Sequence, residues 1–508
     1  MATQLGSVGS ESGTRFHMLI GNEWPEAVSG ETFERRSPAD GHLVGSYPNG
    51  DARDADRAVK VARQIFDEGT WANGPSKERV AILRRTADLL RANIEPLSRM
   101  IVEEVGRPIK LARVEVLGAA DVFDYNAGLA LDLHGDAVTQ QVPDAVGLIV
   151  HEPVGVVAMM TPWNFPLNLL SWKLGPALAV GCTVVCKPSH HTSGSTLMLG
   201  RLFLEAGLPP GVINVVTSER DNGAVVGKAL AEHPLVDKVA FTGSTATGRK
   251  VLHATADTFK RVSLELGGKS PNVVFADAAS LDDAVEGAFF GIYRNSGQVC
   301  VAGSRLLVQE SIKDAFVEKL VHLTKTGIRL GDPFDPSTNM GPVISKQQLD
   351  KVLHYVDTGK SEGAQLLVGG ERARSGALAQ GFYVQPTIFD RVTNEMTIAR
   401  EEIFGPVLSV LTFKDAEDAL RMANDTLYGL GAAIWTRDID KAFTFAKRVK
   451  AGTVWVNAYH GIGLWGMPYG GYKQSGVGRE LGHEGLKEYM ETKSIHIKLN
   501  GPVRWPDK

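Results

Sequence analysis

Short apolar, β-branched runs alternate with helical stretches through the middle of this chain, and this alternation constrains the fold more than any other feature of the sequence. The predicted strands are Val154 to Met160, Thr183 to Lys187, Val212 to Val216, Lys238 to Phe241 and Asn272 to Phe275. The predicted helices between them are Leu167 to Val180, Gly194 to Ala206, Asn222 to Glu232 and Thr245 to Thr258. Strands separated by helices of roughly 10 to 15 residues indicate a parallel, doubly wound sheet, which binds ligands at the carboxyl ends of its strands.

A second alternating region runs from Arg305 to about Val456. Its predicted strands are Leu306 to Gln309, Val407 to Leu411, Ala432 to Trp435 and Thr453 to Val456. Two α/β units in one chain predict a cleft between them. Elsewhere, apolar spacing from Pro75 to Val105 predicts a pair of surface helices. The apolar and basic alternation from Ser494 to Leu499 is typical of an exposed edge strand that pairs with another subunit.

Length, charge and cysteine content exclude several classes of protein. The 508 residues correspond to about three folding units at roughly 150 residues each. A net charge of −4 is too small for this length to favour nucleic acid or an anionic membrane as a partner. Three cysteines exclude a disulfide scaffold and a four-cysteine zinc site, so we expect no metal and a reducing, cytoplasmic compartment. Residues 1–15 are polar and rich in Gly and Ser, which predicts a flexible N-terminal arm.

Cys300 is the candidate nucleophile, because it follows a polar turn that contains glycine, Asn295 to Val299. A thiolate attacks carbonyl carbon well and leaves readily from a thioester. The alternative for Cys300 is a buried small hydrophobe, which is our interpretation of Cys182 and Cys186. Its position in a loop favours a chemical role without deciding it.

Two other polar residues fit the same chemistry. Glu265 lies between two leucines, so it either points to solvent or has the raised pKa that a general base needs near neutral pH. Gly267 and Gly268 permit close approach by another backbone or a ligand. Asn164 lies in a loop stiffened by two prolines, where its amide either donates to a developing oxyanion or caps the next helix.

A glycine-bounded turn between a strand and a helix, from Lys238 to Gly248, is a candidate phosphate site. Backbone N–H groups at a helix start can hold a diphosphate, although this spacing matches neither G-x-G-x-x-G nor a P-loop. An ordinary strand-to-helix turn is the alternative. Lys187, at the carboxyl end of its predicted strand, is either a ligand contact or a surface residue.

Six motifs occur in order along the chain: Thr161 to Pro166, Lys187 to Ser189, Phe241 to Ser244, Leu264 to Lys269, Gly297 to Cys300 and Glu402 to Pro406. Their order and spacing resemble those of the aldehyde dehydrogenase superfamily. The resemblance extends from about Met18 to Ile497. It implies an α/β fold with two doubly wound parallel-sheet domains and a small β oligomerisation arm. The implied ranges are 16–132 and 153–265 for a Rossmann-like cofactor domain, 266–475 for a catalytic domain, and 133–152 with 488–500 for the arm.

The resemblance implies oxidation of an aldehyde to the carboxylic acid with NAD or NADP. Cys300 would be the nucleophile, Glu265 the base, and Asn164 the side-chain half of the oxyanion hole, with the N–H of Cys300 as the other half. The implied cofactor contacts are Trp163, Lys187, Ser189, His190, Gly243, Ser244, Glu402 and Phe404. Members that transfer the acyl group to coenzyme A usually lack the acid, so Glu265 implies hydrolysis. Members are generally homodimers or homotetramers, and we expect a homotetramer or a homodimer here.

One departure from the family pattern concerns the cofactor. Members that prefer NAD commonly have a glutamate after Lys-Pro-Ser/Ala, where it holds the adenosine ribose, and His190 occupies that position here. Without the carboxylate, repulsion of a 2′-phosphate is absent, and a protonated imidazole would attract one. NADP is therefore an alternative to NAD, which we still expect to be the cofactor.

The positions that line the aldehyde site in the family are uncharged in this chain. They are Leu169, Trp172, Val299, Val301, Ile462, Trp465 and Tyr469. This set predicts an apolar aliphatic or aromatic aldehyde, because a distal carboxylate would require an Arg or Lys partner. A quaternary ammonium aldehyde, of the betaine aldehyde kind, is the alternative, since aromatic faces bind such cations.

Two interpretations from other classes remain. A non-catalytic descendant would act as a binding or structural protein, although it would have no reason to keep Cys300, Glu265 and Asn164 together. A cysteine hydrolase would need a histidine near Cys300, for which His460 is the candidate, and would leave the cofactor motifs unexplained.

Overall fold

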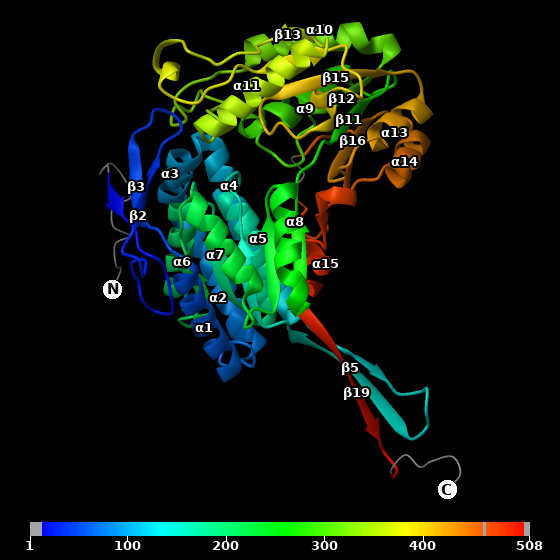
Figure 1. Cartoon of the computed structure of the whole chain (residues 1–508). Coiled ribbons are helices and arrows are strands. Elements are labelled where there is room, and N and C mark those ends of the chain that lie inside the picture. Colours follow the sequence, from blue (N-terminus) through cyan, green and yellow to red (C-terminus); the bar gives the residue numbers. More distant parts are fainter. Residues whose placement is uncertain (1–12, 461–463, 502–508) are drawn as a thin grey trace.

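The computed structural model of the chain describes residues 13–460 and 464–501. Two large sheets lie in separate lobes, and a slender arm projects from the lower lobe in Figure 1. Residues 1–12 of the predicted flexible arm lie outside the described part of the chain. The next residues are ordered as β1 (Thr14–Arg15), which pairs in parallel with β3 (Leu43–Pro48) beside β2 (Thr32–Arg36).

The lower lobe contains a six-stranded sheet in the order β18-β10-β9-β6-β7-β8. These strands are β6 (Val156–Met160), β7 (Thr183–Lys187), β8 (Ile213–Val215), β9 (Lys238–Thr242), β10 (Arg261–Glu265) and β18 (Gly476–Val477). All pairs are parallel except that of β18 with β10. The helices are α1 (Ala52–Glu68), α2 (Ser76–Ala92), α3 (Ile94–Val105), α4 (Ile109–Leu131), α5 (Pro166–Val180), α6 (Ser193–Ala206), α7 (Arg220–Glu232) and α8 (Thr245–Thr255).

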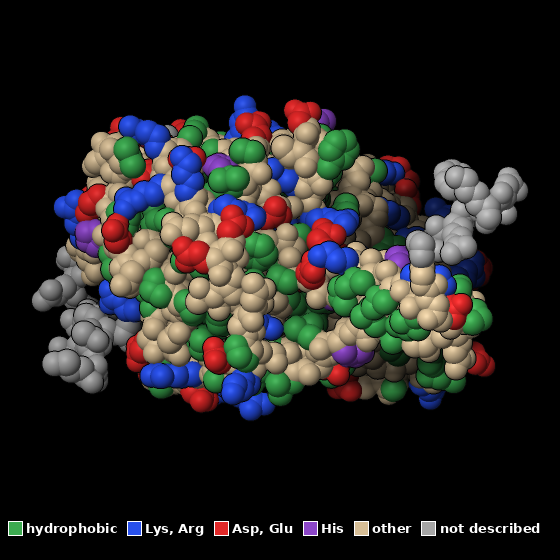
Figure 2. Space-filling view, turned by 90° about the horizontal axis from the view of Figure 1, so that it is seen from below, with side chains coloured by type: hydrophobic (Ala, Val, Ile, Leu, Met, Phe, Trp, Pro, Cys, Tyr) green, Lys and Arg blue, Asp and Glu red, His purple; other side chains and the backbone are tan. Residues whose placement is uncertain are grey.

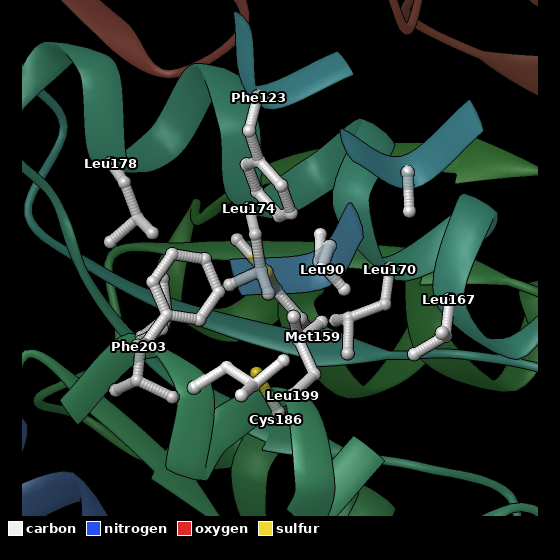
Figure 3. Packing of buried hydrophobic residues seen from close by; sticks show 14 of the residues in the cluster. Leu90, Phe123, Met159, Leu167, Leu170, Leu174, Leu178, Cys186, Leu199 and Phe203 are labelled. Carbon is white, nitrogen blue, oxygen red and sulfur yellow. The ribbon is translucent and has the colours of Figure 1, made fainter. Parts of the chain in front are cut away.

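Helix α5 lies at the centre of the largest core cluster. Its leucines meet Met159 of β6, Phe123 of α4 and Phe203 of α6 in Figure 3. Each fully buried leucine contributes roughly 1.5–3 kcal/mol. Almost every α5 side chain is buried, because the helix is covered on all sides. A charged residue in such a helix must therefore find a partner inside the protein.

The upper lobe contains a seven-stranded sheet in the order β13-β14-β15-β12-β11-β16-β17. Its strands are β11 (Pro271–Val274), β12 (Arg305–Gln309), β13 (Gln365–Val368), β14 (Thr387–Asp390), β15 (Val407–Phe413), β16 (Gly431–Trp435) and β17 (Thr453–Val456), and only β13 is antiparallel to its neighbour. The helices are α9 (Leu281–Tyr293), α10 (Lys313–Gly327), α11 (Lys346–Ser361), α12 (Thr397–Arg400), α13 (Ala416–Asn424) and α14 (Ile439–Arg448). The predicted α/β class with parallel sheets is confirmed.

The arm is a three-stranded sheet of β4 (Asp136–Val138), β5 (Ala145–Pro153) and β19 (Met490–Lys498), entered through α15 (Gly482–Lys487). The predicted edge strand is the outer part of β19, which pairs antiparallel with β5 of the same chain. Hydrophobic side chains gather on the side of the molecule that carries the arm in Figure 2, and Ile495 and Ile497 of β19 are exposed. In the described ranges, no helix combines the length and apolarity needed to cross a membrane.

Candidate active site

The loop that presents Cys300 has an unusual backbone. Asn295, Ser296 and Gly297 have φ values of 51°, 56° and 73°, so three consecutive residues adopt the left-handed conformation. This conformation is unfavourable for a serine and is retained only where the surroundings enforce it. A Cβ atom at Gly297 would lie 2.0 Å from the carbonyl oxygen of Gly405, so only glycine fits there. The turn directs the chain towards β12 and leaves Cys300 partly exposed.

The Cys300 thiol is protonated at neutral pH in this structure. Burial raises its pKa to about 12, and the hydrogen bond with Tyr469 opposes this increase. The negative charges of Glu402 and Glu265 raise the pKa further. The Sγ atom lies 3.2 Å from the hydroxyl oxygen of Tyr469, and only the tyrosine can donate once the sulfur is a thiolate. Addition of Cys300 to a carbonyl therefore requires a base.

Glu265 ends β10 and is buried. Burial raises its pKa well above the usual value, and the charge of Glu480 raises it further. Its Oε2 atom has no hydrogen-bond partner in the described part of the protein. Glu480 itself forms a buried ion pair with Lys173 of α5, whose Nζ donates to Thr242 at 2.6 Å. The raised pKa lets this carboxylate accept a proton more readily than an exposed glutamate does.

Two glycines after Glu265 join β10 to the nucleophile loop. A Cβ atom at Gly268 would lie 2.4 Å from the carbonyl oxygen of Cys300. A Cβ atom at Gly267 would lie 2.5 Å from Oε2 of Glu402. The predicted close approach by another backbone is therefore confirmed at Gly268, and Glu265, Cys300 and Glu402 share one region of the protein.

Asn164 is buried in the loop between β6 and α5, and its Nδ2 atom donates to the carbonyl oxygen of Gln298 at 3.1 Å. No side chain of the preceding residues caps α5. The first N–H groups of the helix instead donate to Oε1 of Glu115, at 3.0 Å from Leu167 and 3.3 Å from Asn168. The helix-cap alternative for Asn164 is therefore wrong. Its amide lies against the loop that carries Cys300, as an oxyanion donor would require.

The nucleotide candidates lie at carboxyl ends of strands in the lower lobe. Lys187 ends β7, its Nζ donates to the carbonyl oxygen of Pro188 at 3.2 Å, and burial lowers its pKa to about 8. Gly243 follows β9, where a Cβ atom would lie 2.5 Å from the ring of Phe241. Ser244 caps α8, because its Oγ accepts the N–H of Thr247 at 3.2 Å.

The remaining cofactor candidates surround these strand ends and the nucleophile loop. The rings of His190 and His191 lie 3.8 Å apart, and Oγ of Ser189 accepts the N–H of His191 at 3.3 Å. Trp163 meets Phe404 edge to face at 5.4 Å. Oε1 of Glu402 accepts the N–H of Gly268 at 3.1 Å. A small cavity is lined by Gly268, Val299, Glu402 and Phe404 among others.

Most candidate substrate-site residues belong to one apolar cluster near Cys300. Leu169, Val299 and Val301 are buried in it, and Trp172 and Tyr469 pack against it with their rings 4.9 Å apart. Trp465 differs, because the tip of its ring approaches Gly118 of α4. Ile462 lies outside the described residues.

Sequence reasoning missed a positive charge beside this cluster. The guanidinium of Arg294 lies 5.3 Å from the ring centre of Phe165 and 5.5 Å from that of Phe290, and it donates to Nδ1 of His460 at 2.8 Å. Burial lowers the pKa of Arg294 to about 10, and the charge of a Cys300 thiolate raises it. Burial and the charge of Arg294 lower the pKa of His460 to about 3, which makes it a poor base. The cysteine hydrolase interpretation loses its base for this reason.

Comparison with known proteins gives the class of the enzyme. The model of the aldehyde dehydrogenase family matches residues 24–495, and the chain belongs to this family. A betaine aldehyde dehydrogenase of Bacillus subtilis is 42% identical over 96% of this chain and 99% of its own length. Among solved structures, an NAD-dependent aldehyde dehydrogenase from Sinorhizobium meliloti is 45% identical, with a TM-score of 0.94 and 97% of each chain covered. An indole-3-acetaldehyde dehydrogenase of P. syringae in complex with NAD+ and IAA is 45% identical, with a TM-score of 0.92, covering 95% of this chain and 96% of its own.

Proposed function

We propose that Cys300, Glu265 and Asn164 carry out the oxidation of an aldehyde to the carboxylic acid in this member of the family. The observation that supports it best is the close approach of Gly268, three residues after Glu265, to the carbonyl oxygen of Cys300, together with the effect of the Glu265 charge on the Cys300 thiol. A nucleophile, a base with a raised pKa and an amide donor are the three groups that this chemistry requires.

The proposed mechanism assigns one task to each side chain. Cys300 gives its proton to the Glu265 carboxylate, which passes it to solvent, and its sulfur adds to the aldehyde carbon. The amide of Asn164 with the N–H of Cys300 holds the oxygen of the thiohemiacetal. Loss of hydride from that carbon leaves a thioester. Glu265 takes a proton from water, which attacks the thioester carbon and displaces the Cys300 sulfur, so the acid and the thiol are released.

NAD, when bound, accepts the hydride, and the chain offers residues that fit it. The buried amine of Lys187 and the start of α8 behind Ser244 suit ribose hydroxyls and a diphosphate. Glu402 would hold the second ribose, with Trp163 and Phe404 beside it. The NAD complex of the P. syringae relative supports NAD for this chain. NADP is the alternative cofactor, because His190 stands where a carboxylate would repel its 2′-phosphate.

We propose an apolar aliphatic or aromatic aldehyde as the substrate. The cluster of Leu169, Trp172, Val299, Val301 and Tyr469 supports this class. The name of the B. subtilis relative raises a quaternary ammonium aldehyde instead, but the positive charge of Arg294 would repel that substrate. The same charge would attract a distal carboxylate, so succinate semialdehyde is the more demanding comparison for the apolar class. Specificity constants for benzaldehyde, hexanal, succinate semialdehyde and betaine aldehyde test the proposal, and a clear preference for either charged aldehyde would refute it.

The proposed domain ranges, assembly and compartment have their own support. The proposed division is 16–132 with 153–265, 266–475, and 133–152 with 488–500, and the presence of two large sheets and an arm supports it, although β18 of the lower sheet lies just beyond residue 475. Exposed Ile495 and Ile497 on the edge strand β19 favour pairing with a second subunit and a homotetramer. Three free cysteines suit the cytoplasm. Light scattering of the purified protein would test the subunit count.

The experiment that tests the mechanism uses Cys300→Ser and Asn164→Ala. Both variants receive NAD or NADP with the aldehyde panel, and reduced nicotinamide is measured by absorbance. Cys300→Ser should be inactive, since an alcohol is a far weaker nucleophile than a thiol. Asn164→Ala should lose about 3 kcal/mol of transition-state stabilisation, a factor of roughly a hundred or more in rate. Near-normal oxidation by Cys300→Ser contradicts the mechanism, and absence of reduced cofactor with the unmodified chain favours a non-catalytic binding protein.

A further inference from the structure

We propose that Arg107 is a positioning residue for the oxyanion-binding amide of Asn164, an inference that rests on the role of Asn164 proposed above. The Arg107 side chain is 2% exposed and lies just before α4. It donates to the main-chain oxygen of Asn164, and its Nε donates to Oδ1 of Asn295 at 3.1 Å. One guanidinium thus contacts both the oxyanion loop and the nucleophile loop.

Glu115 pairs with the charge of Arg107 and also contacts the far end of the loop between β6 and α5. Arg107 forms a buried ion pair with Glu115 of α4. The second oxygen of Glu115 accepts the N–H groups of Leu167 and Asn168, the first free donors of α5. Arg107 therefore holds the backbone before α5 by donating to the carbonyl oxygen of Asn164, and Glu115 holds the start of α5 by accepting its first N–H groups.

Asn295 completes the connection to Cys300. Its Nδ2 donates to the main-chain oxygen of Asn164 at 3.1 Å and to that of Gln298 at 3.2 Å. The Gln298 oxygen is also the acceptor for the Asn164 amide. Because Arg107 holds Oδ1 of Asn295, it fixes which way this side chain faces. The space between the Asn164 amide and the sulfur of Cys300 therefore depends on Arg107.

The geometry of these contacts requires an arginine. Arg107 uses three nitrogens towards three separate acceptors, and its plane stacks on Phe165 with 4.2 Å to the ring centre. A lysine would keep the charge opposite Glu115 but has a single ammonium without the planar fork. Arg107→Lys thus separates the positioning role from the ion pair.

The test measures single-turnover formation of reduced NAD by the purified full-length enzyme. Arg107→Lys should slow this step by at least about tenfold, because small displacements of reacting groups have large effects on rate. The dissociation constant of NAD and the melting temperature should stay close to those of the unmodified enzyme. Arg79→Lys is the matched control, since Arg79 is buried and donates to main-chain oxygens of Ala179 and Gly74 at 3.0 and 2.7 Å. It should keep the normal turnover rate.

A second variant keeps the inference testable if Arg107→Lys does not fold. Asn295→Gly is compatible with the left-handed backbone and keeps the Arg107–Glu115 pair but removes the Asn295 side-chain link between the loops, and it should slow the same step. The double variant should be no slower than the slower single variant, because both remove one unit.

The outcomes separate this inference from the proposed function. A normal single-turnover rate in Arg107→Lys, or a loss accompanied by equal weakening of NAD binding, overturns the positioning role. Multiplied losses in the double variant overturn it as well. If Asn164→Ala turns over normally, the proposed oxyanion role fails instead. If Asn164→Ala is slow and Arg107→Lys is not, only the inference fails.

Discussion

The hydrogen bond between Tyr469 and Cys300 makes a quantitative prediction about thiol reactivity. Tyr469→Phe removes the side-chain hydrogen bond that, among the described residues, favours the thiolate over the thiol, so the pKa of Cys300 should rise further. A hydrogen bond to a charged group contributes roughly 1.5–3 kcal/mol, and one pKa unit corresponds to about 1.36 kcal/mol. The expected increase is therefore about one to two units.

This increase acts on the alkylation rate in two opposing ways. With a pKa of about 12 in the unmodified enzyme, every practical pH lies below it, so the thiolate fraction falls about tenfold for each unit gained. A more basic thiolate is also more nucleophilic, which recovers about threefold for each unit. Alkylation of Cys300 by iodoacetamide, without NAD, should slow about threefold to tenfold.

The matched control is Tyr459→Phe. Tyr459 is a buried tyrosine of the same cluster, but its hydroxyl donates to the carbonyl oxygen of Val301 at 2.7 Å. This variant should be alkylated at close to the normal rate. Unchanged or faster alkylation of Tyr469→Phe would falsify the assignment of Tyr469 as the donor to the thiolate.

Three further predictions follow from the site. Gly268→Ala should lose at least about a hundredfold in turnover, because the new Cβ meets the rigid backbone at Cys300. In Gly267→Ala the new Cβ meets the movable carboxylate of Glu402, so this variant should lose less. Equal losses of the two variants in steady-state assays would contradict this reasoning. Glu480→Gln removes a negative charge that raises the pKa of Glu265. Because Glu265 acts as a base only above its pKa, the acid limb of the pH–rate profile should move to lower pH by about one unit. A move to higher pH refutes the coupling. Arg294→Gln removes a positive charge that repels a cationic substrate, so the specificity constant for betaine aldehyde relative to benzaldehyde should rise on the order of tenfold. An unchanged ratio means that the charge of Arg294 does not act on the substrate.

The sequence predicts most strands of the two large sheets well, because they are short apolar runs bounded by turns, although β10 and β18 of the lower sheet are not among the predicted strands. β7 and β17 have the predicted bounds, and β6, β8, β9 and β11 differ by one or two residues at an end. β13 and β14 were not predicted, since they lie at one side of the upper sheet and β13 is only partly buried. Periodicity gives little signal for such strands.

The chemistry of the site was predictable where a residue type stood out in its local sequence, and not where it depends on tertiary contacts. Cys300 and Glu265 are unusual within their own segments. Arg107 is 57 positions from Asn164, so nothing in the local sequence of either residue predicts the contact. Lys173 did carry a signal, because it is the only charged residue of the otherwise apolar helix α5. Three left-handed residues before Cys300 also depend on contacts from distant loops.

The pairing of β19 with β5 affects the order of events during synthesis. The two strands are separated by more than 300 positions, with Ile495 opposite Leu148, and β19 follows every described strand of both lobes along the chain. Until then β5 can pair only with β4. The long ladder of the arm can therefore form only after the strands of both lobes have been synthesised, and a chain terminated before Met490 would keep those strands but leave β5 without its partner β19.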